Sequence, residues 1–187
     1  MPATAVLLFE DETILRLFPV LRRAWTPSGE QASIGISGRN AKQVLYDTIN
    51  VHTGHRIVLR GKNMSQDGFQ KFLRLLRRSY RNLPIWILLD REGIHTTSKS
   101  IALAKALDIE LIWLPKQCPE LNAMDQLWRS VKNDISANYQ FSSIDEHTSF
   151  AEQYIKKLTN KKALCKAGIL SKNFWLKLLC KNFWPLT

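Results

Sequence analysis

The sequence has little cysteine and no long apolar run. Its 187 residues include three cysteines, Cys118, Cys165 and Cys180, an odd number without the spacing of metal ligands. No stretch approaches the roughly 18 consecutive apolar residues of a membrane-spanning helix. Acids at positions 10–12 interrupt the first apolar run, which argues against a signal peptide. These absences argue against a disulfide scaffold or a membrane protein and predict a reduced, cytoplasmic setting.

Acidic residues are scarce beside basic ones. The chain has 27 Lys and Arg against 16 Asp and Glu, a net charge of +11. The imbalance is largest from Ala151 onward, where there is a single acid, Glu152, and every basic residue is lysine. This favours a polyanionic partner, with nucleic acid ahead of a membrane surface. Charge alone leaves open a solvated basic surface that has no partner.

Hydrophobic residues make up 45% of the chain, enough for one domain with a sizeable core. Short runs rich in β-branched and aromatic residues predict strands, and runs with helical period predict helices. The expected strands are 5–10, 14–18, 43–51, 55–60, 85–89 and 109–114. The expected helices are 66–81, 98–107, one that begins at 122, 144–158 and 161–181. This order predicts an α/β fold, a mixed sheet with helices on both faces.

Three aspartates stand near the ends of predicted elements. Asp11 follows the first strand, Asp90 follows the apolar strand 85–89, and Asp125 lies in the first turn of the helix that begins at Asn122. Sites in such sheets gather at the carboxyl ends of strands. Carboxylates brought together repel one another unless divalent cations bind, and their oxygens favour Mg²⁺ or Mn²⁺. A pair of such ions can activate a nucleophile and stabilise a leaving oxygen in phosphoryl transfer.

Each aspartate also has a purely structural interpretation. Asn122 and Asp125 have the spacing of a capping box, and an acid in a first turn suits the helix dipole. Asp90 could be a turn residue after a strand. Asp11 has acidic neighbours on both sides, so spacing does not single it out.

Three blocks of the sequence resemble the signature blocks of DDE transposases, most nearly those of the bacterial insertion-sequence branch of the mariner superfamily. They are FEDE at 9–12, LDREGIH at 89–95 and LPKQCPELNAMDQLWRSVK at 114–132. The resemblance covers about residues 5–135, and the last block is its most specific part. Segments 17–30 and 69–80 support it.

The resemblance implies a ribonuclease H-like fold: a mixed five-stranded sheet flanked by helices, with extra helices at the C-terminus. It implies that Asp11, Asp90 and Asp125 are the catalytic acids and hold two Mg²⁺ ions, with Mn²⁺ as a substitute. His95 matches the histidine that follows the second acid. The residues expected to contact DNA are His95, Lys99, Arg129, Lys132, Arg74, Arg77 and Arg78. Of these, His95, Arg129 and Lys132 would either contact phosphate or orient the acids.

The implied activity is DNA cleavage and strand transfer during transposition. Residues 1–140 would form the catalytic domain and 141–187 a helical extension packed on it. The expected partners are transposon ends, target DNA, a second copy of the chain on DNA and an upstream-frame DNA-binding polypeptide, since the family's N-terminal end-binding region has no counterpart here. The expected location is the cytoplasm of a bacterium, near the nucleoid.

The sequence departs from the family pattern after the second acid. Arg91 and Glu92 stand where the family has Asn-Ala, Cys118 and Ala123 replace its Ser and Pro, and the third acid is Asp rather than the Glu usual in the bacterial branch. Two alternatives therefore stay open: a catalytically impaired, DNA-binding remnant, and another ribonuclease H-like nuclease such as a junction resolvase.

The C-terminal segment 161–187 carries four large aromatic residues, and two locations would bury them. The first is its own sheet, and the second is another subunit. The aromatic residues are Phe174, Trp175, Phe183 and Trp184.

Overall fold

A computed structural model describes residues 5–179 of the chain, apart from the side chains at 178 and 179. The five strands in this part form one sheet in the order β3-β2-β1-β4-β5. The strands are β1 (Val6–Arg16), β2 (Lys42–Asn50), β3 (Arg56–Gly61), β4 (Ile85–Leu89) and β5 (Ile109–Trp113). β1 pairs antiparallel with β2 and parallel with β4, so the sheet is mixed, as the sequence predicts.

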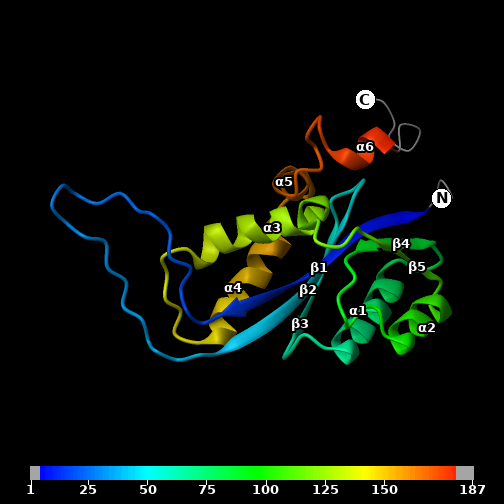
Figure 1. Cartoon of the computed structure of the whole chain (residues 1–187), viewed down its shortest axis with the longest axis horizontal. Coiled ribbons are helices and arrows are strands. Elements are labelled where there is room, and N and C mark those ends of the chain that lie inside the picture. Colours follow the sequence, from blue (N-terminus) through cyan, green and yellow to red (C-terminus); the bar gives the residue numbers. More distant parts are fainter. Residues whose placement is uncertain (1–4, 180–187) are drawn as a thin grey trace.

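Helices cover both faces of the sheet (Figure 1). On one face lie α1 (Gln66–Ser79) and α2 (Ser98–Ala106). On the other lie α3 (Ala123–Val131), α4 (Ile144–Lys157) and α5 (Asn160–Lys166). A single turn of 3₁₀ helix (Pro119–Leu121) precedes α3, a π-helical turn (Lys132–Ser136) follows it, and the short α6 (Trp175–Leu179) comes last. None of the helices in residues 5–179 combines the length and apolar character needed to cross a bilayer.

The central strand β1 supplies both cores because its side chains alternate between faces. Leu7 and Phe9 belong to the core under α3, α4 and α5. Val6 and Leu8 belong to the core under α1 and α2. The same alternation, continued along the strand, decides which way the acids at 10–12 point.

The prediction of two strands at 5–10 and 14–18 was wrong, because β1 runs unbroken from Val6 to Arg16. Its pairing with β2 continues through the acids, from Leu8 opposite Asn50 to Arg16 opposite Lys42. The acids interrupt the apolar run but not the backbone ladder. Asp11 is therefore in the middle of a strand rather than after one.

The prediction of one helix over 161–181 was also wrong. α5 ends at Lys166, and Gly168 takes a positive φ of 72°. The N–H of Gly168 bonds to the carbonyl of Cys165 and that of Ile169 to Leu164, the Schellman pattern that ends helices at glycine.

Phe174 and Trp175, beyond this helix end, pack back on the same chain. Their rings contact that of Phe9 at centroid distances of 5.9 and 6.2 Å. This part of the segment therefore covers its own sheet. Phe183 and Trp184 lie outside the described residues, and both docking on a second subunit and the domain boundary at residue 140 stay predictions.

A long connection, residues 17–41, joins β1 to β2 and extends away from the body of the molecule (Figure 1). Its first part is attached to the segment after the π-helical turn, since Asn138 exchanges hydrogen bonds with the backbone of Arg22. Trp25 further along is fully exposed.

Candidate active site

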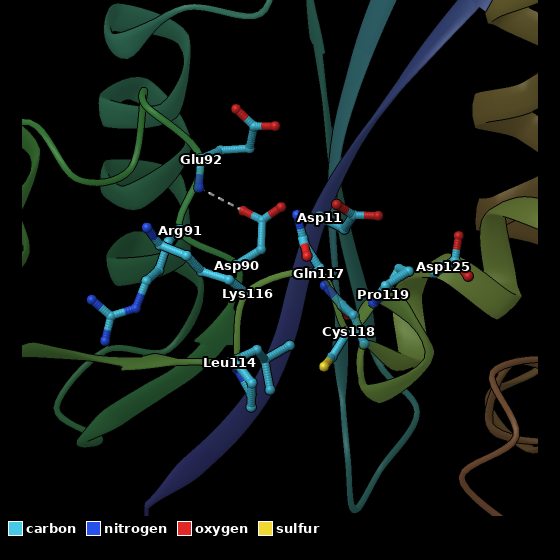
Figure 2. Close-up of a pocket in the computed structure, with 12 residues that line it drawn as sticks. Asp11, Asp90, Arg91, Glu92, Leu114, Lys116, Gln117, Cys118, Pro119 and Asp125 are labelled. Atoms are coloured by element: carbon cyan, nitrogen blue, oxygen red, sulfur yellow. Dashed lines mark hydrogen bonds between the residues drawn. The ribbon is translucent and has the colours of Figure 1, made fainter.

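The three predicted acids line one pocket at the carboxyl end of β4. The pocket has a volume of about 360 Å³. Asp11 comes from the middle of β1, Asp90 directly follows β4, and Asp125 lies on α3 (Figure 2). Residues distant in sequence are thus brought to one cavity. The sequence-based expectation that they meet agrees with this geometry, and their catalytic role is taken up under Proposed function.

The pleat of β1 settles which of its acids faces the pocket. Asp11 projects to the side of Leu7 and Phe9, toward α3, whereas Glu10 and Glu12 project to the opposite face. Burial raises the pKa of Asp11 to about 8, and the negative charges of Glu12 and Asp90 add to this rise. A cation in the pocket would reverse that effect.

Asp90 is oriented by its own loop. Its Oδ1 accepts hydrogen bonds from the N–H of Glu92 and from Nδ1 of His95, both at 3.0 Å. Burial raises the pKa of Asp90, but the bonds from His95 and Glu92 lower it more, so the net pKa lies below its ordinary value. Asp90 is thus a fixed, ionised carboxylate at the edge of the pocket.

The stretch 114–122 carries the chain from β5 to α3. The N–H of Leu114 bonds to the carbonyl of Leu89 at 2.8 Å, and Gln117 turns the chain with a positive φ of 59°. Asn122 then makes two buried hydrogen bonds. Its Oδ1 caps α3 by accepting from the N–H of Met124 at 3.0 Å, and its Nδ2 donates to the carbonyl of Glu10 at 2.8 Å. Asn122 therefore ties the helix that bears Asp125 to the backbone of β1 beside Asp11.

The capping-box interpretation of Asp125 accounts for only half of what the structure shows. Asn122 does cap the helix. The carboxylate of Asp125, however, lines the pocket and forms an ion pair with Arg129 at 2.8 Å. Its side chain is 27% exposed, so it is reachable from solvent.

Two of the predicted DNA-contacting residues lie near the acids. Arg129 pairs with Asp125 and is 72% exposed. Lys132 is half-buried; burial lowers its pKa, while the charges of Asp11 and Asp125 act in the opposite direction. Both cations therefore sit at the border of the pocket.

The remaining predicted DNA contacts lie in the other helical layer. Lys99 is exposed on α2, and Arg74 and Arg78 are exposed on α1. Arg77 is half-buried, and its guanidinium donates to the carbonyls of Tyr80, Leu83 and Asp108, which gives it a structural task. Arg77 and Arg78 line a hollow beside Pro84, just before β4, at the opposite end of that strand from Asp90.

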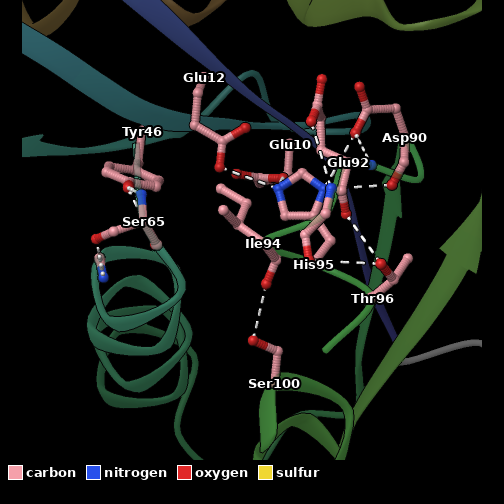
Figure 3. A network of polar contacts seen from close by, with 12 residues as sticks. Glu10, Glu12, Tyr46, Ser65, Asp90, Glu92, Ile94, His95, Thr96 and Ser100 are labelled. Carbon is pink, nitrogen blue, oxygen red and sulfur yellow. Dashed lines mark hydrogen bonds and ion pairs between the residues drawn. The ribbon is translucent and has the colours of Figure 1, made fainter. Parts of the chain in front are cut away.

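His95 is buried on the reverse face of β1, with a side chain only 1% exposed. Direct contact with a DNA phosphate is therefore not open to it in this conformation, and its surroundings support an orienting task. Its Nε2 lies 3.0 Å from Glu12 and 3.7 Å from Glu10 (Figure 3). Burial lowers the pKa of His95, but the charge of Glu10 and the hydrogen bonds with Asp90 and Glu12 raise it to about 11.

From the sequence, Glu10 and Glu12 were considered only as alternatives to Asp11 for the first catalytic acid, and their cluster with His95 was missed. The available signal was their spacing of two along a strand, which places both on the face opposite Asp11. The departure after Asp90 is also explained in part, since the guanidinium of Arg91 lies 5.7 Å from the centroid of the Trp113 ring and turns away from the acids (Figure 2).

Residues 6–148 match the sequence profile of the family described as DDE superfamily endonuclease. The chain belongs to this family. One relative of this chain is the "Insertion element IS630 uncharacterized 39 kDa protein" of Shigella sonnei. The two are 27% identical over 138 residues, which make up 73% of this chain and 40% of that protein.

Solved structures of Mos1 transposase are similar to the DDE chain in fold. The Mos1 paired-end complex with the left transposon end has a TM-score of 0.69 at 17% identity, covering 94% of this chain and 55% of that one. The mariner Mos1 paired-end complex with Mg has 0.71 at 16%, covering 97% and 57%. The Mos1 catalytic domain has 0.64 at 15%, covering 97% and 84%. The predicted ribonuclease H-like fold is confirmed by this likeness. The chain spans less than half of the insertion-element protein and little more than half of the longer Mos1 chains.

Proposed function

We propose that this chain is the catalytic domain of a DNA transposase, which cleaves DNA phosphodiesters and transfers the freed strand to a target. The observation that carries the proposal is the pocket where Asp11, Asp90 and Asp125 converge from three separate elements. Solved structures similar to this chain include Mos1 paired-end complexes with the left transposon end, with Mn and with Mg, and the insertion-element relative fits the same activity.

The donor set fits divalent cations. Three carboxylates share a partly buried pocket, where burial first and then the charges of Glu12 and Asp90 raise the pKa of Asp11. Bound cations would offset this repulsion, and carboxylate oxygens suit Mg²⁺ and Mn²⁺. When bound there, two such ions supply activation of a water or a 3′-hydroxyl and stabilisation of the leaving oxygen.

The rest of the chain prepares this site. His95 and the N–H of Glu92 fix one oxygen of Asp90, and Asn122 fixes the start of α3 against β1. Arg129 and Lys132 stand at the border, where they would attract and orient DNA phosphates. We extend the proposal to transposon ends and target DNA as substrates, to a dimer on DNA, to an upstream-frame DNA-binding polypeptide and to action in the bacterial cytoplasm.

The test is nicking of DNA that carries the element's terminal inverted repeat, with EDTA, Mg²⁺ or Mn²⁺, and with or without the upstream-frame polypeptide. Wild type should nick only with a divalent cation. Asp125→Asn should not, whereas Asp67→Asn should nick like wild type. Asp67 is a matched control, because it is an exposed acid in the first turn of α1 and lies outside the pocket.

Three results would each redirect the proposal. Nicking without transfer to a second DNA would favour a resolvase-like nuclease. Metal and DNA binding without any nicking would favour the impaired remnant. Nicking retained in Asp125→Asn would remove this pocket from the reaction.

A further inference from the structure

A second group of ligand atoms lies on the face of the sheet opposite the pocket of Asp11, Asp90 and Asp125 (the DDE pocket). It consists of carboxylate oxygens of Glu10 and Glu12 and a ring nitrogen of His95, all within 4.8 Å of one another. The three side chains are 0%, 2% and 1% exposed. Figure 3 shows the imidazole between the two glutamates of β1 and Asp90.

Glu10 is the unexplained member of this group. Among the described residues, neither of its oxygens has a hydrogen-bond partner, although the side chain is fully buried. Its nearest opposite charge is Nε2 of His95, at 3.7 Å. A buried carboxylate without hydrogen bonds is strongly disfavoured unless a charge compensates it. One imidazole faces three carboxyl groups here, those of Glu10, Glu12 and Asp90, and burial together with the charge of Glu12 raises the pKa of Glu10.

His95 is held in the orientation of a metal ligand. Its Nδ1 faces Oδ1 of Asp90 at 3.0 Å. A metal ion would have to displace the Nε2 proton of His95, after which Nδ1–H would still donate to Asp90 while the Nε2 lone pair faced the glutamates. A carboxylate behind a histidine is the usual support for a metal-binding imidazole, since it fixes the tautomer and the ring.

We propose that Glu10, Glu12 and His95 form a second divalent-cation site, separate from the DDE pocket and selective for transition metals. Two carboxylate oxygens and an imidazole nitrogen favour Mn²⁺ or Zn²⁺ over Mg²⁺, which prefers oxygen ligands alone. The ion would join β1 to the loop after β4 and would hold Asp90 through His95. This site does not depend on the proposed function.

The test must first remove metal binding at the DDE pocket. In a chain with Asp11→Asn and Asp125→Asn, titration calorimetry and native mass spectrometry with Zn²⁺ and Mn²⁺ should find one bound ion. Adding Glu10→Gln should weaken this binding at least about 10-fold. His147→Gln should leave it unchanged. His147 is a matched control, because it is a buried histidine that bonds to Ser136 and the carbonyl of Arg16 rather than to acids.

A thermal scan separates binding from folding. Glu10→Gln keeps the size of the side chain and removes only its ionisable carboxyl group, so in EDTA it should melt close to its parent, the chain with Asp11→Asn and Asp125→Asn. Zn²⁺ should raise the melting temperature of the parent and not that of the variant. If Glu10→Gln fails to fold, Glu12→Gln gives the same comparison.

Two findings would overturn the proposal. One is that the chain with Asp11→Asn and Asp125→Asn, but with both glutamates intact, binds no ion. The other is that the glutamate variants keep the bound ion with unchanged affinity. The first would leave a protonated His95 as the cation beside the glutamates, and the second would mean that the ion binds elsewhere. Neither result depends on cleavage, so failure here is distinct from failure of the proposed function.

Discussion

Asn122 is the position where a single atom exchange should loosen the candidate site. Asn122→Asp keeps an oxygen that caps α3, because Asp is as good an N-cap as Asn. It replaces the Nδ2 donor, 2.8 Å from the carbonyl of Glu10, by an acceptor. The helix that carries Asp125 then loses its tether to β1.

The magnitude follows from the burial of this bond. Asn122 is 5% exposed, so water does not replace the lost donor. Leaving a buried carbonyl unpaired costs about 1–3 kcal/mol, and the new buried carboxylate faces that carbonyl oxygen, so the free energy of unfolding should fall by at least that amount. Asn122→Ala loses the same buried hydrogen bond and also the cap, worth about 1 kcal/mol, but adds no buried charge.

Urea denaturation with an unchanged m value measures this loss, and nicking assays well below the melting temperature measure the effect on the site. Thr159→Asp is the matched control, because it places Asp at the exposed N-cap of α5, next to lysines, and should change stability by less than about 0.5 kcal/mol. Asn122→Asp as stable and as active as Thr159→Asp would refute the tether.

Three further predictions concern other positions. Asp125→Asn should abolish metal-dependent nicking. It should lower the free energy of unfolding by at most about 1 kcal/mol, because the carboxylate contributes only a helix-dipole interaction and an exposed ion pair. A larger loss of stability in denaturation would favour a structural role. In EDTA, Asp11 binds a proton in the folded state up to a pH of about 8 but releases it near 3.8 when unfolded. The titration of Asp11 should therefore lower the free energy of unfolding of the wild type as the pH rises from 3.8 to about 8, by at most about 1.4 kcal/mol per pH unit. Urea melts of Asp11→Asn should lack this slope. Gly168→Ala should destabilise the chain by about 1–2 kcal/mol in the same melts, because its φ is positive and a Cβ would meet the Gln126 side chain; an unchanged midpoint would contradict this.

Much of the fold could be predicted because its signals are local. The run 85–89 is apolar throughout, and it forms β4 with the predicted bounds. The helical period of 66–81 gives α1, which begins at the predicted residue and buries Phe69, Phe72, Leu73 and Leu76. The capping chemistry of Asn122 likewise needs only its neighbours in sequence.

The candidate site was predictable only in part. The residue types and the resemblance named Asp11, Asp90 and Asp125, but spacing could not choose among the acids at 10–12. That choice depends on the unbroken pairing of β1 with β2, which fixes the alternation of the strand. The break at Gly168 has a local signal, a glycine inside the predicted helix 161–181.

The sequence by itself determined where apolar residues recur, which helices could be capped and which carboxylates were available, because these depend on neighbours a few residues apart. Only the tertiary structure decided that Asp11 faces the pocket while Glu10 and Glu12 meet His95 behind it. It also decided that Asn122 donates to the backbone carbonyl of Glu10 and that the guanidinium of Arg77 donates to the carbonyls of Leu83 and Asp108. Such contacts join residues far apart in the chain, so they follow from sheet register and helix packing, which no local pattern encodes.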